Sequence, residues 1–495
     1  MAKGRDDRSG VSGVLLWLLP CLVAFLTVGC SGSEPSQEEA EEVQSPTDRP
    51  NIIFVLTDDL DYASAQKMPE VRSQLIEQGT SFENAFVSFP TCCPSRATIL
   101  TGLYAHNHGV KGNSPPQGGF RTFRSEGLEE STIAVRLQEA GYQTAYFGKY
   151  LNGYADGDPS HIPTGWDEWY GKLDEQKLYD YRINENGKRV SYGSEADDFY
   201  TDVLSSQATD FVGRAASDFR PFFMYVAPTA PHEPATPARR HQGAFSDEES
   251  PLPPSLNEEN VSDKPSWIRG IDRLSNEQVS QIDRVYQQRL SSMLAVDEMF
   301  ASLVQELKKA GKLDNTFIFF TSDNGIHGGE HRIAVGKRTP YEESAHVPLF
   351  IRGPGVPAAS KVERLTLNTD FAPTFAGLAG VEFPGDGHSL APLLSGDEGT
   401  SSWRTAILLE AFANEEAEEG LQANLPDYQA VRTESHKYVE YENGEKELYD
   451  LQADPYELDN LYESADPSLI EGLKATLDAL RNCSEEGCQE AEHAS

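Results

Sequence analysis

The chain has 495 residues, which is too many for one small domain, so we expect one large core and a smaller one. Its content of 38% hydrophobic and 24% charged residues is typical of a soluble globular protein. The 79 acidic residues outnumber the 41 basic ones, and the net charge of −38 argues against nucleic acid or an anionic membrane surface as a partner. An anionic substrate would therefore need a local positive pocket.

The N-terminus is predicted to be an export signal over residues 1–30. Basic residues precede the apolar run Val11–Leu26, as in a secretory signal peptide. Cys30 then follows a small residue, as in a bacterial lipoprotein signal, although Thr27 stands where leucine is more usual. A plain signal peptide or an anchor helix is the alternative, but the run is shorter than the ~20 residues of a spanning helix. We therefore favour lipidation at Cys30, followed by a solvated tether over residues 31–49.

The first predicted strand is the apolar run Asn51–Thr57. A continuous apolar run of this length is typical of a strand buried on both faces, as in a parallel sheet. It ends in Asp58 and Asp59, and carboxylates crowded at the end of a central strand are costly unless a cation neutralises them. A structural turn is the alternative interpretation.

Two adjacent cysteines follow, before the sequence Pro-Ser-Arg and an apolar run that ends at Gly102. Pro94 fits the first turn of a helix, so Cys92 would lie at the N-terminus, where the helix dipole favours an anion. Arg96, about one turn further on, adds a positive charge to the same face. A buried thiol pair, Cys92 with Cys93, is the alternative.

Two more predicted strands end in cationic side chains. The strand 144–147 delivers Lys149 after a glycine, although a lysine in such a place is often only a surface residue. The strand 221–227 leads to His232, whose loop is stiffened by a proline on each side of His232–Glu233.

A second strand end offers oxygen ligands. After the longest predicted helix, 281–309, the strand 316–321 leads into Asp323 and Asn324. Together with the earlier aspartates these are hard oxygen donors of the kind that Ca²⁺ or Mg²⁺ takes, and no Cys/His array with zinc spacing accompanies them. One more buried strand is predicted over 347–351.

The C-terminal part, residues 401–490, is predicted to form a separate set of strands and a helix. Strands are predicted over 406–409 and 428–441, with a hairpin turn after the second and a helix further on. Cys483 and Cys488 are close in sequence in a chain with an export signal, which favours a short disulfide over a metal pair.

The order Cys-x-Pro-Ser-Arg followed by Leu-Thr-Gly resembles the signature of the sulfatase family, and the elements from Asn51 to about Gly396 match that family in order. The resemblance implies an α/β fold like that of alkaline phosphatase over residues 50–396, with a large mixed or parallel sheet flanked by helices and a small sheet-plus-helix subdomain behind it. It also implies that a formylglycine-generating enzyme oxidises Cys92 to formylglycine, whose hydrated aldehyde is the nucleophile. Cys93 fills the free position.

The same resemblance assigns a metal and a sulfate pocket. The residues that would hold Ca²⁺, or alternatively Mg²⁺, are Asp58, Asp59, Asp323, Asn324 and the oxidised Cys92. Those that would surround the sulfate are Arg96, Lys149, His232 and Lys337. Asp323 would take the attacking proton, and either His232 or Lys337 would protonate the leaving oxygen.

The resemblance is closer still to N-acetylglucosamine-6-sulfatases and heparan endosulfatases. It rests on the double cysteine, on His106-Asn107-His108, on Gly148–Asn152 and on Ser322–Gly325 with His327. Many sulfatases carry a histidine two residues after the lysine, but Leu151 fills that position here. His106, His108 and Asn113 are candidates for the missing group. The predicted substrate contacts are Asn113, Asn152, His106, His108 and His327.

The predicted function is therefore removal of sulfate from sulfated sugars, in particular 6-sulfated N-acetylglucosamine of glycosaminoglycan-type glycans. The partners would be a sulfated glycan and the enzyme that modifies Cys92, with no nucleic acid. The chain would be a cell-envelope lipoprotein, with secretion as the alternative. The rival functions are a broad arylsulfatase, a phosphonate or phosphodiester hydrolase, and a non-catalytic glycan-binding protein with an unmodified cysteine.

Overall fold

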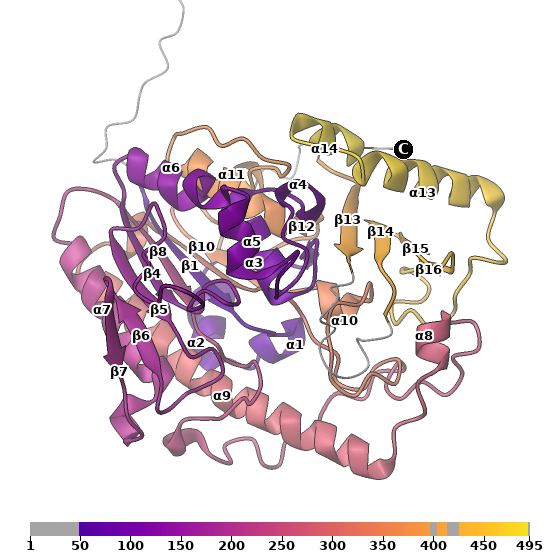
Figure 1. Cartoon of the computed structure of the whole chain (residues 1–495), viewed down its shortest axis with the longest axis horizontal. Helices are drawn as coiled ribbons and strands as arrows, with labels where there is room; N and C mark the ends of the chain where they lie inside the picture. Colours follow the sequence, from indigo (N-terminus) through magenta and orange to yellow (C-terminus); the bar gives the residue numbers. More distant parts are fainter. Residues whose placement is uncertain (1–48, 397–402, 413–424, 494–495) are drawn as a thin grey trace, which may run out of the picture. The chain divides into compact units, whose positions relative to one another are not determined.

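The computed structural model of the chain describes residues 49–396, 403–412 and 425–493 (Figure 1). The predicted export signal, Cys30 and all but the last residue of the predicted tether lie outside these ranges. Within them, no helix is both long and apolar enough to cross a membrane.

A ten-stranded mixed sheet organises the larger part of the described chain, in the order β11-β2-β10-β9-β1-β8-β4-β5-β6-β7. Its strands are β1 (Asn51–Thr57), β2 (Thr80–Phe82), β4 (Gln143–Gly148), β5 (Glu168–Lys172), β6 (Arg182–Glu185), β7 (Lys188–Ser191), β8 (Phe222–Ala227), β9 (Thr316–Ser322), β10 (Leu349–Arg352) and β11 (Ser360–Val362). The five central strands β9, β1, β8, β4 and β5 run parallel, whereas β10 is antiparallel to β9. A separate pair joins β3 (Ala85–Phe86) to β12 (Thr366–Leu367).

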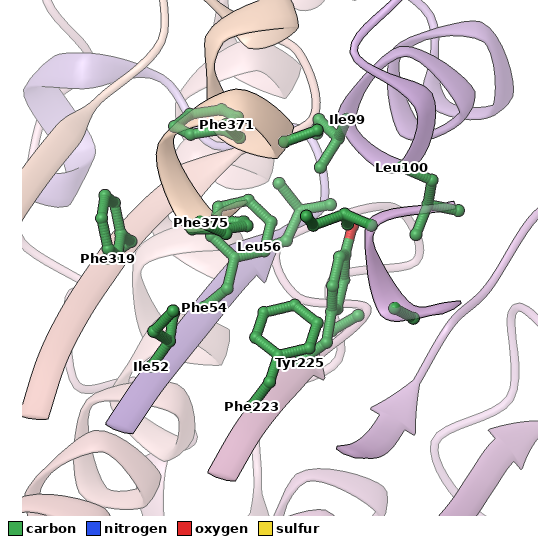
Figure 2. Packing of buried hydrophobic residues seen from close by; sticks show 14 of the residues in the cluster. Ile52, Phe54, Leu56, Ile99, Leu100, Phe223, Tyr225, Phe319, Phe371 and Phe375 are labelled. Atoms are coloured by element: carbon green, nitrogen blue, oxygen red, sulfur yellow. The ribbon is translucent and has the colours of Figure 1, made fainter. Parts of the chain in front are cut away.

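Helices cover both faces of this sheet, which explains why its central strands are apolar throughout. In β1, Ile52, Phe54 and Leu56 face one layer, and Ile53 and Val55 face the other, because successive side chains of a strand alternate. The first layer contains α3 (Cys92–Thr101), α6 (Ile133–Glu139) and α11 (Phe371–Leu378), and the second contains α7 (Tyr200–Ala215) and α9 (Asn276–Lys309). Figure 2 shows aromatic rings of α11 lying against β1.

The remaining helices are mostly single turns in the connections. They are α1 (Tyr62–Ala65), α2 (Pro69–Val71), α4 (Ala105–His108), α5 (Gly119–Ser125), α8 (Ser266–Arg269), α10 (Glu342–Ala345) and α12 (Ala391–Leu394). The long helix α9 begins five residues before the predicted start at Gln281, because Ser275 caps it and exchanges hydrogen bonds with Gln278.

The C-terminal part forms a four-stranded antiparallel sheet, β13 (Ala406–Ala411), β14 (Tyr428–Thr433), β15 (His436–Tyr441) and β16 (Lys446–Asp450). Helix α13 (Pro467–Leu480) packs on it and α14 (Glu486–Ala491) follows. The predicted 428–441 strand is thus a hairpin, β14 and β15, with a turn at Glu434–Ser435. The predicted fold class, a large helix-flanked sheet with a small C-terminal sheet, is confirmed.

Candidate active site

The ends of two neighbouring strands bring four oxygen-bearing side chains together. Strands β1 and β9 are adjacent and parallel, with Thr57 opposite Ser322, so Asp58 and Asp59 emerge beside Asp323 and Asn324. The backbone N–H of Asp59 donates to Asp323 Oδ1 at 3.1 Å. Asp59 has a φ of 65°, a left-handed conformation that aspartate tolerates better than most residues and that turns the chain sharply at the site.

Cys92 lies at the first position of α3, directly after the N-cap Thr91, and is only 1% exposed. Its Sγ is 3.5 Å from Asp58 Oδ1 and 2.8 Å from Lys337 Nζ. Burial raises the pKa of the Cys92 thiol well above its ordinary value, although Lys149 and Lys337 act in the opposite direction. A thiol that stays protonated is a weak nucleophile.

Each carboxylate of the site is paired with a cation. Lys149 Nζ lies 2.7 Å from Asp58 Oδ2, and Lys337 Nζ lies 2.5 Å from Asp59 Oδ1. Arg96 Nε donates to Asp323 Oδ2 at 2.8 Å, while its buried Nη2 has no hydrogen-bond partner among the described residues. An anion with several oxygens would satisfy that donor.

These pairs favour the charged forms of Asp58 and Asp59, whereas burial and then the charge of Asp58 raise the pKa of Asp323. Burial by itself would raise the pKa of Asp58, but the charge of Lys149 and then of the other cations leaves that pKa well below its usual value. Burial likewise would lower the pKa of Lys337, yet Asp59 and Cys92 keep it well above that of a free lysine. Both lysines therefore carry a positive charge at neutral pH and, with Arg96, offset the charges of the carboxylates. A divalent cation bound at the carboxylates would make this pocket positive, as an anionic substrate needs.

His232 is the most exposed residue of the cluster, at 26% of its side-chain area. Its Nδ1 lies 2.7 Å from the carbonyl oxygen of Glu233, which accepts a hydrogen bond from it. The opposite nitrogen, Nε2, points to the site and lies 3.8 Å from Asp59 Oδ2. The imidazole can therefore exchange a proton on the side where a substrate would enter.

A cluster of side chains at this site could hold a metal ion. One ligand atom each from Asp58, Asp59, Cys92 and His232 lie within 4.8 Å of one another. Asn324 presents its Nδ2 to Asp59 at 2.7 Å, and its buried Oδ1 has no partner in the described part of the chain. Turning the amide over would direct that oxygen to the same point as the carboxylates, which is the donor set that Ca²⁺ or Mg²⁺ prefers.

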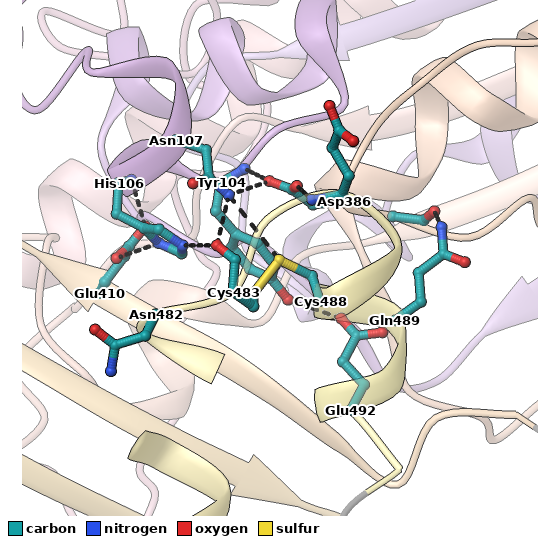
Figure 3. Close-up of a disulfide and its surroundings, with 12 residues drawn as sticks. Tyr104, His106, Asn107, Asp386, Glu410, Asn482, Cys483, Cys488, Gln489 and Glu492 are labelled. Carbon is teal, nitrogen blue, oxygen red and sulfur yellow. Dashed lines mark hydrogen bonds and ion pairs between the residues drawn. A yellow bond between two sulfur atoms is a disulfide. The ribbon is translucent and has the colours of Figure 1, made fainter. Parts of the chain in front are cut away.

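Three residues predicted to contact substrate are hydrogen-bonded within the protein. His108 Nε2 lies 3.0 Å from Thr98 Oγ1, and His327 Nε2 lies 2.7 Å from Thr339 Oγ1. Both imidazoles are almost completely buried. Figure 3 shows His106 beside the Cys483–Cys488 disulfide; its Nδ1 lies 3.1 Å from Glu410 and its Nε2 lies 3.2 Å from the Cys483 carbonyl.

The two predicted asparagines lie near the start of α3. Asn113 Oδ1 accepts the backbone N–H of Cys93 at 3.0 Å, and Asn152 Nδ2 donates to Glu175 at 3.2 Å. Leu151, which stands where many sulfatases have a histidine, is buried in the apolar core.

One residue of the site was not anticipated from the sequence. Arg289 is buried on α9, where its Nη1 donates to the carbonyl of Pro231 at 3.2 Å and its Nη2 donates to the carbonyl of Asp59. It thus ties the Asp58–Asp59 turn to the turn that carries His232. An arginine on the buried face of a long amphipathic helix is the signal that could have found it.

Comparisons with known proteins identify the family of this chain. Residues 50–381 match the family model described as Sulfatase, and residues 329–483 match the model described as N-sulphoglucosamine sulphohydrolase, C-terminal. Human N-acetylglucosamine-6-sulfatase is 33% identical over 99% of this chain and 93% of its own. The extracellular sulfatase SULF-1 homolog of Drosophila melanogaster is 35% identical over 78% of this chain, but only 35% of that longer protein is covered.

A solved structure of a protein in complex with its substrate D-glucosamine-2-N,6-O-disulfate is similar over 90% of this chain and 99% of its own. Its TM-score is 0.76 and its sequence identity 27%. With a family model that spans well over half of its length and a relative that is 33% identical over nearly all of it, the chain belongs to the sulfatase family.

Proposed function

We propose that this sulfatase removes the 6-O-sulfate of N-acetylglucosamine-type sugars in glycosaminoglycan-type glycans. The observation that carries the proposal is the buried Cys92, which lies between Asp58, Lys149 and Lys337 at the start of α3. The choice of sugar is supported by the name of the human relative and by the glucosamine disulfate bound in the similar structure.

Cys92 is proposed to act after conversion to formylglycine by a formylglycine-generating enzyme. The raised pKa of its thiol supports this, because an unmodified Cys92 would be protonated and weakly nucleophilic. Formylglycine would supply a hydrated aldehyde, with one hydroxyl to attack sulfur and a second to allow release of sulfate. Cys93 is buried beside it, and its backbone N–H is bound by Asn113.

Cations of the chain are proposed to hold the sulfate. Lys149 and Lys337 remain protonated beside Asp58 and Asp59, and the Nη2 of Arg96 offers a further donor. Preorganised charges of this kind stabilise the charge that builds on the sulfonyl oxygens in the transition state.

The metal of this site is proposed to be Ca²⁺, with Mg²⁺ as the alternative. The residues that would hold it are Asp58, Asp59, Asp323, Asn324 and the modified Cys92. When bound, it would supply Lewis-acid polarisation of the sulfate. Asp323 is also proposed to take the attacking proton.

His232 is proposed to protonate the leaving sugar oxygen. Its Nδ1–H is held by the Glu233 carbonyl, so it is the imidazolium form that carries a second proton on Nε2, the nitrogen that faces the site, and gives it to the leaving oxygen. Lys337 is the weaker candidate, because Asp59 holds its pKa well above that of a free lysine. We assign Lys337 to sulfate binding.

Export to the cell envelope, with a lipid anchor on Cys30, is proposed from the N-terminal sequence. The name of the extracellular relative in Drosophila supports export but says nothing of the anchor. Labelling with a fatty-acid analogue in wild type and in Cys30→Ala would test the anchor.

The central test compares two adjacent cysteines. Cys92→Ala should abolish turnover while the fold and metal binding persist, and Cys93→Ala should remain active. The mass of the peptide that carries Cys92 should show the loss of the thiol in the active protein. Active Cys92→Ala with inactive Cys93→Ala would refute the assignment. Turnover of a panel of defined sulfated sugars then identifies the substrate. Comparing these rates with the rates on phosphate diesters tests the rival function, a phosphonate or phosphodiester hydrolase.

A further inference from the structure

Lys172 is a buried lysine beside the active site that the sulfatase signature does not include. It ends strand β5, which pairs with β4 so that Gly171 lies opposite Gly148, the residue before Lys149. Gly148 in turn lies opposite Ala227 of β8, two residues before Thr229. Lys149, Lys172 and Thr229 therefore emerge at the same edge of the sheet.

The surroundings of Lys172 make its burial costly. Only 2% of it is exposed; its Nζ lies 3.2 Å from Thr229 Oγ1 and 3.8 Å from the ring centroid of Tyr200. Burial, and then the nearby charge of Lys149, lower the pKa of Lys172 to about 7, against the weaker effects of the carboxylates Asp58, Glu175 and Asp174. An apolar residue of the same length would fill this space at lower cost, so the amino group of Lys172 needs an explanation beyond packing.

The hydrogen bond to Thr229 leads directly to the proposed acid. The carbonyl of Thr229 accepts the backbone N–H of His232 at 3.0 Å, which closes the turn that presents the imidazole. The carbonyl of the next residue, Ala230, accepts the backbone N–H of Asp58 at 3.4 Å. Thr229 thus begins the segment that fixes His232 relative to the carboxylates.

We propose that Lys172 is a positioning residue: by holding the Thr229 side chain, it fixes the turn from Thr229 to His232 and so the place of the imidazole in the active site. The proposal rests on the role of His232 given above. It predicts an effect on proton transfer to the leaving group, because a misplacement of about 1 Å costs up to about 10²-fold in rate.

The test uses Lys172→Met, which keeps the chain length but removes the ammonium, and Thr229→Val, which keeps the shape but removes the hydroxyl. Each should lower kcat for a 6-sulfated N-acetylglucosamine by about 10- to 100-fold. KM should change little, and kcat for nitrophenyl sulfate should fall much less, because a phenolate leaves without protonation. The double variant should be no slower than the slower single variant, because both changes remove the same hydrogen bond, between Lys172 and Thr229.

Lys264→Met is the matched control. Lys264 is also fully buried, and its Nζ lies 3.0 Å from the hydroxyl of Tyr449 in the C-terminal sheet. Lys264→Met should lower the stability of the protein without changing the ratio of kcat for the sulfated sugar to kcat for nitrophenyl sulfate. This control therefore distinguishes the effect of losing a buried lysine from the effect of misplacing the His232 imidazole.

The outcomes are distinct. If Lys172→Met and Thr229→Val keep the wild-type ratio while His232→Ala loses sugar turnover selectively, the positioning role is wrong and the proposed acid stands. If His232→Ala shows no selective loss, the acid assignment is wrong and the role of Lys172 falls with it. Rate losses that multiply in the double variant would also overturn the proposal. Should Lys172→Met fail to fold, Thr229→Val decides alone.

Discussion

Acid should destabilise this protein through histidines that the fold keeps neutral. Burial, and then the charge of His106, lower the pKa of His108 from an ordinary 6.5 to about 3, and burial does the same for His327. Below pH 6.5 the unfolded chain binds protons at these positions and the folded chain does not, so stability falls as the pH falls. One pH unit corresponds to about 1.4 kcal/mol. At pH 5, which is 1.5 units below 6.5, each of these histidines should therefore lower the free energy of unfolding by about 2 kcal/mol.

His108→Asn isolates one of these contributions. Urea titrations at pH 7 and at pH 5 give the free energy of unfolding at each pH. The loss of stability from pH 7 to pH 5 should be about 2 kcal/mol smaller in the variant than in wild type. The variant should also be weaker at both pH values, because His108 Nδ1 and Nε2 contact Val110 and Thr98, but that loss cancels in the difference. An unchanged pH dependence would refute the reasoning that burial keeps this imidazole neutral.

Three further predictions concern the active site. His232→Ala should slow hydrolysis of a 6-sulfated sugar by about 10²–10⁴-fold and that of a nitrophenyl sulfate clearly less, whereas Lys337→Ala should impair both; the reverse pattern would exchange their roles. Chelation should remove activity, and Ca²⁺ or Mg²⁺ should restore it; restoration by Zn²⁺ alone would contradict an oxygen site. Gly148→Ala should abolish activity and lower the melting temperature, because at a φ of 124° its Cβ would lie 2.0 Å from the Ala227 carbonyl oxygen and displace Lys149; a stable, active variant would count against this.

The sequence predicted the central strands and the fold class because their information is local. An apolar run such as Asn51–Thr57, followed by carboxylates, favours a buried strand with a polar end, and β1 has those bounds. The start of α9 was missed by five residues, although Ser275 and Gln278 form a recognisable capping box.

Residues whose role depends on tertiary contacts were harder to predict from the sequence. His106, His108 and His327 look alike in the sequence, and only packing shows that two are buried and that His106 is held by Glu410 and the disulfide segment. Arg289 reaches the site from a helix more than 200 residues away from Asp59 in sequence, and no local pattern predicts such a contact. A charged residue within the apolar face of a helix indicates that it has a polar partner in the fold, but the sequence does not identify that partner.

The burial of Cys92 sets an order of events in the life of the protein. With 1% of its surface accessible, beneath Lys337 and the aspartate turn, the side chain offers no room for a second enzyme to reach its sulfur once the chain has closed. If Cys92 becomes formylglycine, the conversion must therefore precede folding, while the segment around it is still extended. In that case a chain that folds first would keep its thiol and stay inactive. Folding and modification would then compete, and the active fraction of a preparation would record which of the two was faster.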